Sequence, residues 1–220
     1  RFKSAKYYHQ QLLHKRMISY STKEIQELPH LNKINLINSA TGYKSANLIG
    51  TKSLDGITNL AIFSSVTHYG SAPPIFGFVV RPTTVRRNTY TNIKNTEFFT
   101  INPIRESDIE EAHHTSAKYP SDISEFDRTH FEEEYKDGFY APFIKGAPIQ
   151  IGLKIIEEHC IKANNTILVL GEVVKLYVDE SLIENDLFIN LSKAKIATIN
   201  GLDGYTIPTN PKRLPYQRPK

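Results

Sequence analysis

The sequence predicts a mainly β fold, an antiparallel barrel that is closed or partly open and carries helical insertions. Short runs rich in β-branched residues alternate with turn residues over 45–101. Two longer runs of the same kind follow at 149–155 and 166–178. Only one helical pattern interrupts the early strands, which argues against a doubly wound sheet. Closure into a barrel hides the edges of such strands from other chains.

The first half of the chain begins with a short helix and continues as strands. Ser21-Thr22-Lys23-Glu24 has the spacing of a capping box and predicts a helix near 22–28, ended by Pro29. Asp55-Gly56 lies between two apolar runs and predicts a tight hairpin. The predicted strands are residues 34–37, 45–51, 57–66 and 75–80.

The next segment is expected to be helical and then to return to the sheet. A helix is predicted over 83–96, opening after Pro82 and followed by a strand at 97–101. The polar stretch 103–146 is expected to run over the surface and to hold one helix near 107–114.

Two long strands are expected after the polar stretch. In 149–155 every second residue is apolar, which predicts a strand with one buried face, and 166–178 repeats the pattern less strictly. From Tyr205 the chain contains four prolines and is expected to be extended, held only where something docks it. The predicted organisation is therefore one domain over 17–204 with a tail over 205–220.

Residues 1–16 are expected to be an extension of the domain. Arg1 cannot be a translation start and Met17 is the only methionine, so this stretch is interpreted as foreign to the native protein or as the remnant of a longer reading frame.

The charge and the cysteine content exclude several classes of protein. The 220 residues carry a formal charge of +4, but the stretches 1–16 and 205–220 hold basic residues and no acids. The intervening body is mildly acidic, which argues against nucleic acid as a partner. The longest apolar runs, such as 60–63 and 75–80, are too short to span a membrane. The single cysteine, Cys160, cannot form an internal disulfide, so a cytoplasmic, reducing location is expected.

A candidate anion site surrounds the predicted helix over 83–96. Guanidinium and hydroxyl groups gather near its first turns, where free N–H groups and the helix dipole favour a phosphate. The run Ser64-Ser65-Val66-Thr67 follows a predicted strand and offers donors to a flat polar ring. Together they predict a site for a mononucleotide cofactor; the competing interpretation is a solvated helix face. The residues near the helix are Arg81, Thr83, Thr84, Arg86, Arg87 and Thr89.

The same stretch resembles the flavin reductase family with the FMN-binding split-barrel fold. The resemblance combines an Asn-x-Ala-x-x-Ser strand, a Pro-Pro pair and a basic-Asp-Thr-x-x-Asn-Ile helix. The matching residues are Asn59, Ala61, Ser64, Pro73, Pro74, Arg87, Thr89, Asn92 and Ile93. Further matches are Thr115-Ser116-Ala117, Tyr119-Pro120, Glu125-Phe126, Ala147-Pro148-Ile149, Gly201 to Tyr205 and Arg213 to Tyr216. The chain departs from the pattern at Asn88, where Asp is common, and at Ser65-Val66, where aromatic residues are frequent.

The resemblance implies a homodimer of Greek-key, antiparallel split β-barrels that binds FMN noncovalently near the subunit interface, with the 205–220 tail docked on the domain or on the dimer partner. It implies ring or ribityl contacts from Asn59, Ser64, Ser65, Val66 and Thr67. It further implies contacts at the phosphate end from Arg81, Arg87, Asn88, Thr89 and Asn92. NADH or NADPH would supply a hydride to the flavin, so no side chain is expected to act as a general base. His113 and Ser116 are weaker candidates for contact with the nicotinamide.

Several alternatives remain open at this stage. The first is a non-catalytic FMN-binding or electron-transfer module, and a weaker one is a small barrel that binds nucleic acid through its basic ends. No metal site is expected, because His113-His114, His130 and His159 lie in different directions or segments. Cys160 is expected to be a quiet thiol, and Ser64 and Ser65 lack the partner base of a hydrolase.

Overall fold

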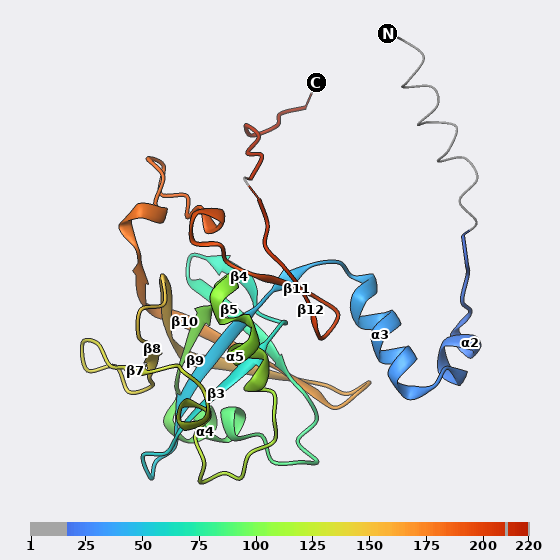
Figure 1. The fold of residues 1–220 in the computed structure, drawn as a ribbon, viewed down its shortest axis with the longest axis horizontal. Helices are drawn as coiled ribbons and strands as arrows, with labels where there is room; N and C mark the ends of the chain where they lie inside the picture. The colour runs from blue at the N-terminus through green and yellow to red at the C-terminus, as the bar shows by residue number, and fades with distance from the viewer. Residues whose placement is uncertain (1–16, 210, 220) are drawn as a thin grey trace.

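The computed structural model describes residues 17–209 and 211–219, so the predicted extension over 1–16 lies outside the described residues. Antiparallel strands dominate the fold, as Figure 1 shows. The helices are α2 (Thr22–Glu27), α3 (His30–Ala40), α4 (Asn88–Thr96) and α5 (Ile109–His114). Four 3-10 turns are η1 (Glu106–Asp108), η2 (Glu125–Arg128), η3 (Glu180–Leu182) and η4 (Leu191–Ala194). The strands are β1 (Lys44–Ser45), β2 (Asn47–Lys52), β3 (Thr58–Phe63), β4 (Thr67–Ser71), β5 (Pro74–Val80), β6 (Phe98–Pro103), β7 (Glu133–Glu134), β8 (Phe143–Ile144), β9 (Ile149–Ile161), β10 (Thr166–Val178), β11 (Thr198–Asn200) and β12 (Gly204–Thr206).

The main sheet has seven strands in the order β3-β2-β6-β9-β10-β5-β4, and every pairing in it is antiparallel. A second sheet joins β1, β11 and β12, and β7 pairs with β8. The predicted mainly β, antiparallel fold with inserted helices is therefore confirmed.

The core divides into two main clusters. The larger is built on the central strands and includes Phe78, Phe99 and Leu153, all with no exposed side-chain surface. The second lies where β2 and β3 meet α5 and η2, around Leu48, Leu60 and other fully or nearly buried apolar residues. Successive residues of a strand point to opposite faces, so β2 contributes to both clusters, with Ile49 in the larger and Leu48 in the second.

Helix α4 packs against β2 and β3 through buried residues on one face. Ile93 has no exposed surface, and Asn92 donates from Nδ2 to Thr51 Oγ1 at 3.1 Å. This contact fixes the helix on the sheet near the end of β2.

The predicted strand over 34–37 is wrong, because these residues lie in α3. A run of four residues is too short for its periodicity to separate strand from helix. Leu31, Ile34 and Ile37 are spaced by three, as on one face of a helix. Gly42 follows with φ of +80°, the conformation that ends many helices.

The predicted helix over 83–96 is too long at its start, because α4 begins at Asn88. Thr83, Thr84 and Val85 are β-branched and follow Pro82, and β-branched residues lose rotamer freedom in a helix. Residues 81–86 are therefore a loop, and Arg87 is the N-cap residue of α4.

The other predicted elements lie close to their predicted positions, but β4, β7, β8, β11 and β12 were not predicted. The expectation that 103–146 runs over the surface is wrong in part, because apolar residues such as Phe126 and Phe143 of this stretch are buried in the core. The capping box is formed, with Ser21 Oγ accepting from Glu24 N and the Glu24 carboxylate accepting from Ser21 N. The predicted helix near 107–114 corresponds to η1 and α5. Strands β9 and β10 are 13 residues each and form a hairpin longer than β6 and β5, the strands that flank them.

The C-terminal segment leaves the domain later than predicted. Tyr205 and Thr206 belong to β12 and pair with β11. Beyond them, Arg213 makes two hydrogen bonds to the Asp186 carboxylate and lies over the Phe188 ring at 4.2 Å. Among the described residues, no helix has the length and apolar character needed to cross a membrane.

Candidate functional site

A cavity of about 790 Å³ lies where the ends of β3 and β5 meet the start of α4. The loop over 81–86 and the segment 115–121 continue its lining. Residues of α3 and of the β11–β12 hairpin complete it. The cavity size is typical of a pocket for a small molecule or cofactor.

Most of the residues that the sequence predicted for a cofactor or substrate site line this one cavity. The structure brings them together from two elements, β3 and α4, and three loops. They are Asn59, Ser64, Ser65, Arg81, Arg87, Asn88, Thr89 and Ser116. Their roles toward a ligand stay predictions.

Asn59 and Thr89 are linked directly. Asn59 Nδ2 donates to Thr89 Oγ1 at 3.0 Å, and both side chains are almost fully buried. The bond joins the start of β3 to the first turn of α4. It fixes the helix start relative to the strand that carries the predicted ring contacts.

Arg87 carries the clearest sign that the cavity takes a ligand. Its Nε is buried and makes no hydrogen bond within the part of the chain that the structure describes. A buried donor without a partner is costly, and a guanidinium prefers a carboxylate or phosphate. The residue also caps α4, whose first N–H groups have no partner within the helix. The arrangement is that of an anion site.

The Ser65 side chain holds the loop after β3 in place. Its Oγ accepts from Val79 N at 3.0 Å, which ties the segment after β3 to β5. Ser64 beside it is half-buried in the cavity wall. The two serines therefore present a fixed polar edge at the end of β3.

Four other predicted residues do not line the cavity. Val66 packs against the larger core cluster and its carbonyl accepts from Ser45 Oγ. Thr67 begins β4 and is exposed. Asn92 is buried behind the cavity in its bond to Thr51, and exposed His113 contacts Tyr205 instead.

Glu125 is a cavity residue that the site prediction did not include. It is 6% exposed, and its Oε2 accepts from Leu60 N at 2.9 Å. Burial raises the pKa of this carboxyl, while the hydrogen bond from Leu60 N opposes the rise. The pair Glu125-Phe126 was part of the family resemblance and was the only signal for it in the sequence.

Two His–Tyr pairs are formed by the last two residues of α5. His113 Nδ1 lies 3.0 Å from the Tyr205 hydroxyl, and His114 Nε2 lies 2.7 Å from the Tyr119 hydroxyl. Both tyrosines line the cavity although neither histidine does. Burial, with a smaller contribution from Asp203, raises the pKa of Tyr205 to about 12, so its hydroxyl is neutral near pH 7.

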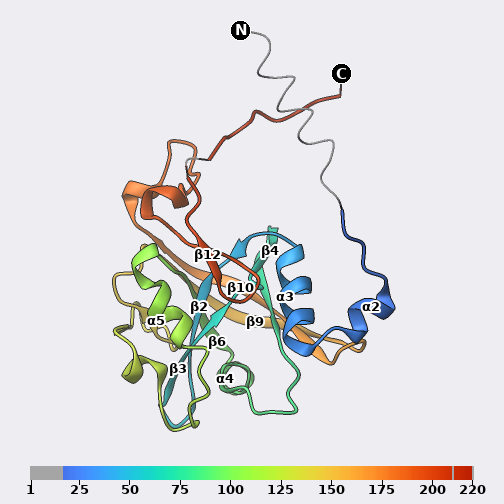
Figure 2. The same ribbon diagram turned by 45° about the vertical axis from the view of Figure 1, so that its right-hand side comes forward.

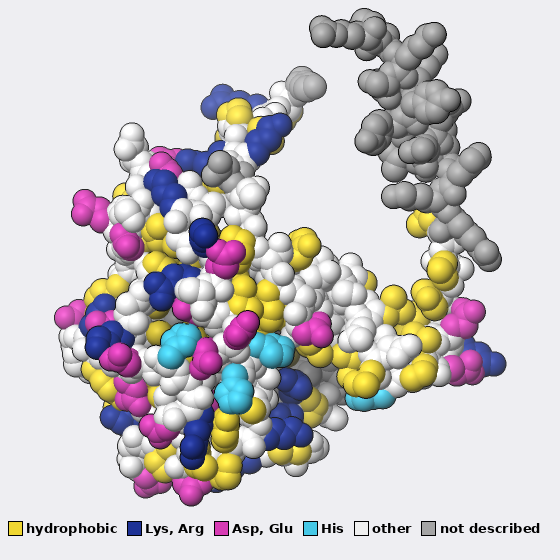
Figure 3. Space-filling view, in the orientation of Figure 1, with side chains coloured by type: hydrophobic (Ala, Val, Ile, Leu, Met, Phe, Trp, Pro, Cys, Tyr) yellow, Lys and Arg dark blue, Asp and Glu magenta, His cyan; other side chains and the backbone are white. Residues whose placement is uncertain are grey.

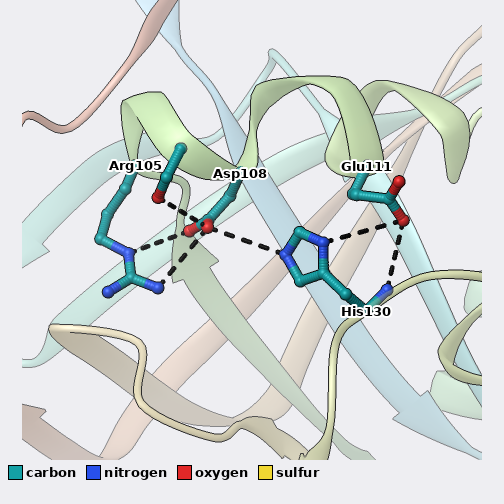
Figure 4. A network of polar contacts seen from close by, with 5 residues as sticks. Arg105, Asp108, Glu111 and His130 are labelled. Carbon is teal, nitrogen blue, oxygen red and sulfur yellow. Dashed lines mark hydrogen bonds and ion pairs between the residues drawn. The ribbon is translucent and has the colours of Figure 1, made fainter.

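A separate polar cluster surrounds His130, away from the cavity lining (Figure 4). Its ring lies 3.8 Å from Asp108 and 3.9 Å from Glu111, and its backbone N donates to Glu111. Arg105 pairs with Asp108 at 3.0 Å. These contacts join the start of α5 to the loop before Phe131. Within residues 17–209 and 211–219, no group of His, Cys, Asp and Glu side chains has the arrangement of a metal site.

Comparisons with known proteins give a consistent result. The family described as "Flavin reductase like domain" matches residues 43–196. A putative flavin reductase with split barrel domain from Shewanella frigidimarina NCIMB 400 is 41% identical, with a TM-score of 0.88 over 91% of this chain and 100% of that one. An FMN-binding protein from Thermus thermophilus, 17% identical, shares the fold with a TM-score of 0.70 over 90% of this chain and 100% of that one. An uncharacterized protein from Aquifex aeolicus (strain VF5) is 25% identical over 147 residues, 66% of this chain and 74% of its own.

The comparisons bear on the fold as well as on the family. The solved structure from Shewanella frigidimarina is described as having a split barrel domain. Its high similarity over most of both chains confirms the predicted split-barrel fold and the resemblance noted from the sequence.

Proposed function

The chain belongs to the flavin reductase-like domain family, and from this premise we propose that it is an FMN-binding flavoprotein that takes a hydride from NADH or NADPH. The family match covers most of the chain, and the cavity lies largely within the matched region. A protein of the same fold, from Thermus thermophilus, binds FMN according to its description.

The observation that carries the proposal is the buried Nε of Arg87 at the start of α4, which has no hydrogen-bond partner among the residues that the structure describes. A flavin mononucleotide has one phosphate at the end of a flexible chain, and this position offers it a guanidinium and free helix N–H groups. Arg81 and Arg86 line the same part of the cavity and add positive charge. The lining residues therefore fit the phosphate end of FMN.

The polar residues at the end of β3 suit the rest of the cofactor. Ser64 and Ser65 lie within the loop that follows β3, held by Val79. Asn59 lies deeper, where Thr89 orients its amide. We assign these side chains to the ribityl chain and the polar edge of the ring.

Bound FMN would supply the redox chemistry, the acceptance of two electrons with a proton as a hydride. The protein's contribution is to hold the two ligands in contact and to exclude water from the reacting atoms. None of the cavity residues is required as a general base. The proposed reaction therefore depends on how the protein positions FMN and the nicotinamide, and not on side chains that transfer protons.

We also propose that the protein is a homodimer in a reducing compartment such as the cytoplasm. α2 and α3 bury no side chain, and hydrophobic side chains are spread along residues 17–43 (Figure 3). The large ones are Met17, Ile18, Tyr20, Leu31, Ile37 and Tyr43. Exposed apolar surface of this extent marks a contact with another chain. Cys160, exposed and free, agrees with a reducing compartment.

The test of the proposed function is the visible spectrum of the purified protein with added FMN, recorded before and after anaerobic addition of NADH or NADPH. We expect a yellow protein that retains FMN through gel filtration and loses its colour on reduction. A protein that retains FMN but is not reduced by either nicotinamide would be the alternative, a non-catalytic electron-transfer module. A protein that does not retain FMN would refute the proposal.

A further inference from the structure

Part of the cavity wall lies outside the family domain. The matched region spans residues 43–196. Five cavity residues come from the flanking segments, namely Ile34 and Asn38 on α3, Ile199 on β11, Leu202 in the following turn and Tyr205 on β12. We call these five residues the accessory wall.

The two segments of the accessory wall are joined to each other. Lys44 pairs with Ile199 in the small sheet, and its Nζ donates to the Asn38 carbonyl at 3.0 Å. A Cβ placed on Gly201 would lie 3.8 Å from Ser39, so the turn after β11 packs against the end of α3. Figures 1 and 2 both show the β11–β12 hairpin beside α3. The wall is one surface rather than two loose segments.

The accessory wall differs in charge from the rest of the cavity. Residues 81–87 bring three arginines to the lining, and Glu125 brings a carboxyl. None of the five residues of the accessory wall is charged at neutral pH. Tyr205, the one titratable member, is neutral at this pH, and burial raises its pKa further, to about 12. It offers this hydroxyl beside His113, at 3.0 Å from Nδ1.

Because of this difference in charge, the two parts of the cavity suit different chemical groups. The arginines at the start of α4 suit a phosphate, whereas an apolar wall with one amide and one hydroxyl suits a flat uncharged ring. A ring that gains a positive charge there meets no anionic side chain among these five residues, and an unpaired charge is costly in apolar surroundings. The nearby Asp203, whose charge acts on Tyr205, is exposed and does not line the cavity.

We propose that the accessory wall binds the ring of the hydride donor and prefers its uncharged, reduced form to its oxidised form. The inference rests on the proposed function. When the dihydropyridine ring of NADH loses a hydride, two electrons and a proton pass to the flavin and the ring becomes a cation. A neutral wall therefore favours binding of the donor and release of the product.

Leu202 is the position for a test, because it is 48% exposed and a charged side chain there can reach both the cavity and solvent. The substitutions Leu202→Glu and Leu202→Lys introduce opposite charges. The matched control is Leu187→Glu, at a leucine that is 79% exposed and does not line the cavity.

The measurement uses the FMN-loaded proteins. NAD⁺ is titrated into each oxidised protein and followed by the change in the flavin spectrum, and the KM for NADH is measured separately. NADP⁺ and NADPH replace them if NADPH reduces the wild type faster. We expect Leu202→Glu to lower the Kd for NAD⁺ roughly three- to fivefold, the size of a half-exposed charge contact, and Leu202→Lys to raise it. The Kd for FMN should not change.

Two outcomes overturn the inference, and they are distinguishable. Equal Kd values for NAD⁺ in Leu202→Glu, Leu202→Lys and Leu187→Glu would refute the accessory wall as the donor site while leaving the proposed function intact. A wild type that does not bind FMN, or whose FMN is not reduced by either nicotinamide, would refute the proposed function and this inference with it.

Discussion

Arg87 is the residue on which the proposed cofactor site depends most. Its Nε is buried without a hydrogen-bond partner in the described part of the chain, and the residue lines the cavity at the start of α4. We expect Arg87→Ala to raise the Kd for FMN roughly 10- to 100-fold, the effect of losing one or two hydrogen bonds to a charged group. Fluorescence titration of FMN measures the change.

The control for this prediction is Arg128→Ala, at an exposed arginine that does not line the cavity. It should leave the Kd for FMN unchanged. If Arg87→Ala and Arg128→Ala bind FMN equally well, the phosphate lies elsewhere.

The second prediction for a single residue concerns Glu125 and the stability of the folded protein. Burial raises the pKa of its carboxyl above the ordinary value of 4.5. A raised pKa in the folded state means that the stabilisation is complete below pH 4.5 and is lost as pH rises through the folded-state pKa. Glu125→Gln keeps an oxygen that accepts from Leu60 N and removes the titration. The free energy of unfolding of the variant, relative to that of the wild type, should therefore be higher at about pH 7 than at about pH 4.

Urea unfolding gives the free energy of unfolding of both proteins at roughly pH 4 and pH 7. The value for the variant minus that for the wild type is then compared between the two pH values. The exposed Glu180, replaced in the same way, is the control. A difference that is the same at both pH values would show that Glu125 does not titrate as its burial implies.

The sequence predicted the residues of the site better than their surroundings. The sequence pattern covers one strand, the loop after it and the start of a helix, and these segments lie side by side at the cavity. The residues that it identified there include Asn59, Ser64, Arg87 and Thr89. Tyr205 and Leu202 could not be assigned to it, because the pairing of β11 with β1 that carries them to the cavity joins residues more than a hundred positions apart. No local pattern contains that contact.

At the scale of elements, β2 shows how closely the sheet packs on the segment before β8. A Cβ on Gly50 would overlap the Pro142 carbonyl oxygen and lie 2.6 Å from Thr100 Oγ1. Thr100 itself donates to that carbonyl at 2.7 Å. Gly50→Ala should therefore lower the free energy of unfolding by about 1–3 kcal/mol, the usual cost of overpacking.

Denaturant unfolding measures the effect, and Gly70→Ala in β4 is the matched control. A Cβ on Gly70 would meet one atom, the Pro73 carbonyl oxygen at 3.2 Å. Equal losses of stability for the two variants would mean that the strands move apart to admit the methyl group at Gly50.

The elements also show where local patterns are insufficient. Strands such as β9 were predictable because their alternation runs for many residues. The helix α3 was mistaken for a strand because the predicted run of four residues, 34–37, is too short to separate a helical period from that of a strand. The start of α4 was misplaced because Pro82 resembles a helix start, while the β-branched residues after it favour a loop.

At the scale of the whole molecule, the segment formed by α2 and α3 shares few contacts with the rest of the described chain. The end of α3 packs against the turn after β11, whereas Leu31 and Ile37 are exposed. The two helices have 6 and 11 residues and bury no side chain. Isolated helices shorter than about 12–15 residues are marginal in water, so they need packing from elsewhere. A second copy of the chain, set against the exposed Leu31 and Ile37 of α3, would provide it.

We therefore expect the wild type to sediment as a dimer and the double variant Leu31→Glu, Ile37→Glu to dissociate at micromolar concentration, because charges replace apolar side chains at the contact. Sedimentation velocity over a range of concentrations measures the change. The control is Leu54→Glu with Leu187→Glu, two leucines that are 70% and 79% exposed on other parts of the surface. If both double variants keep the mass of the wild type, α3 does not form the subunit contact, and its hydrophobic residues must have another partner.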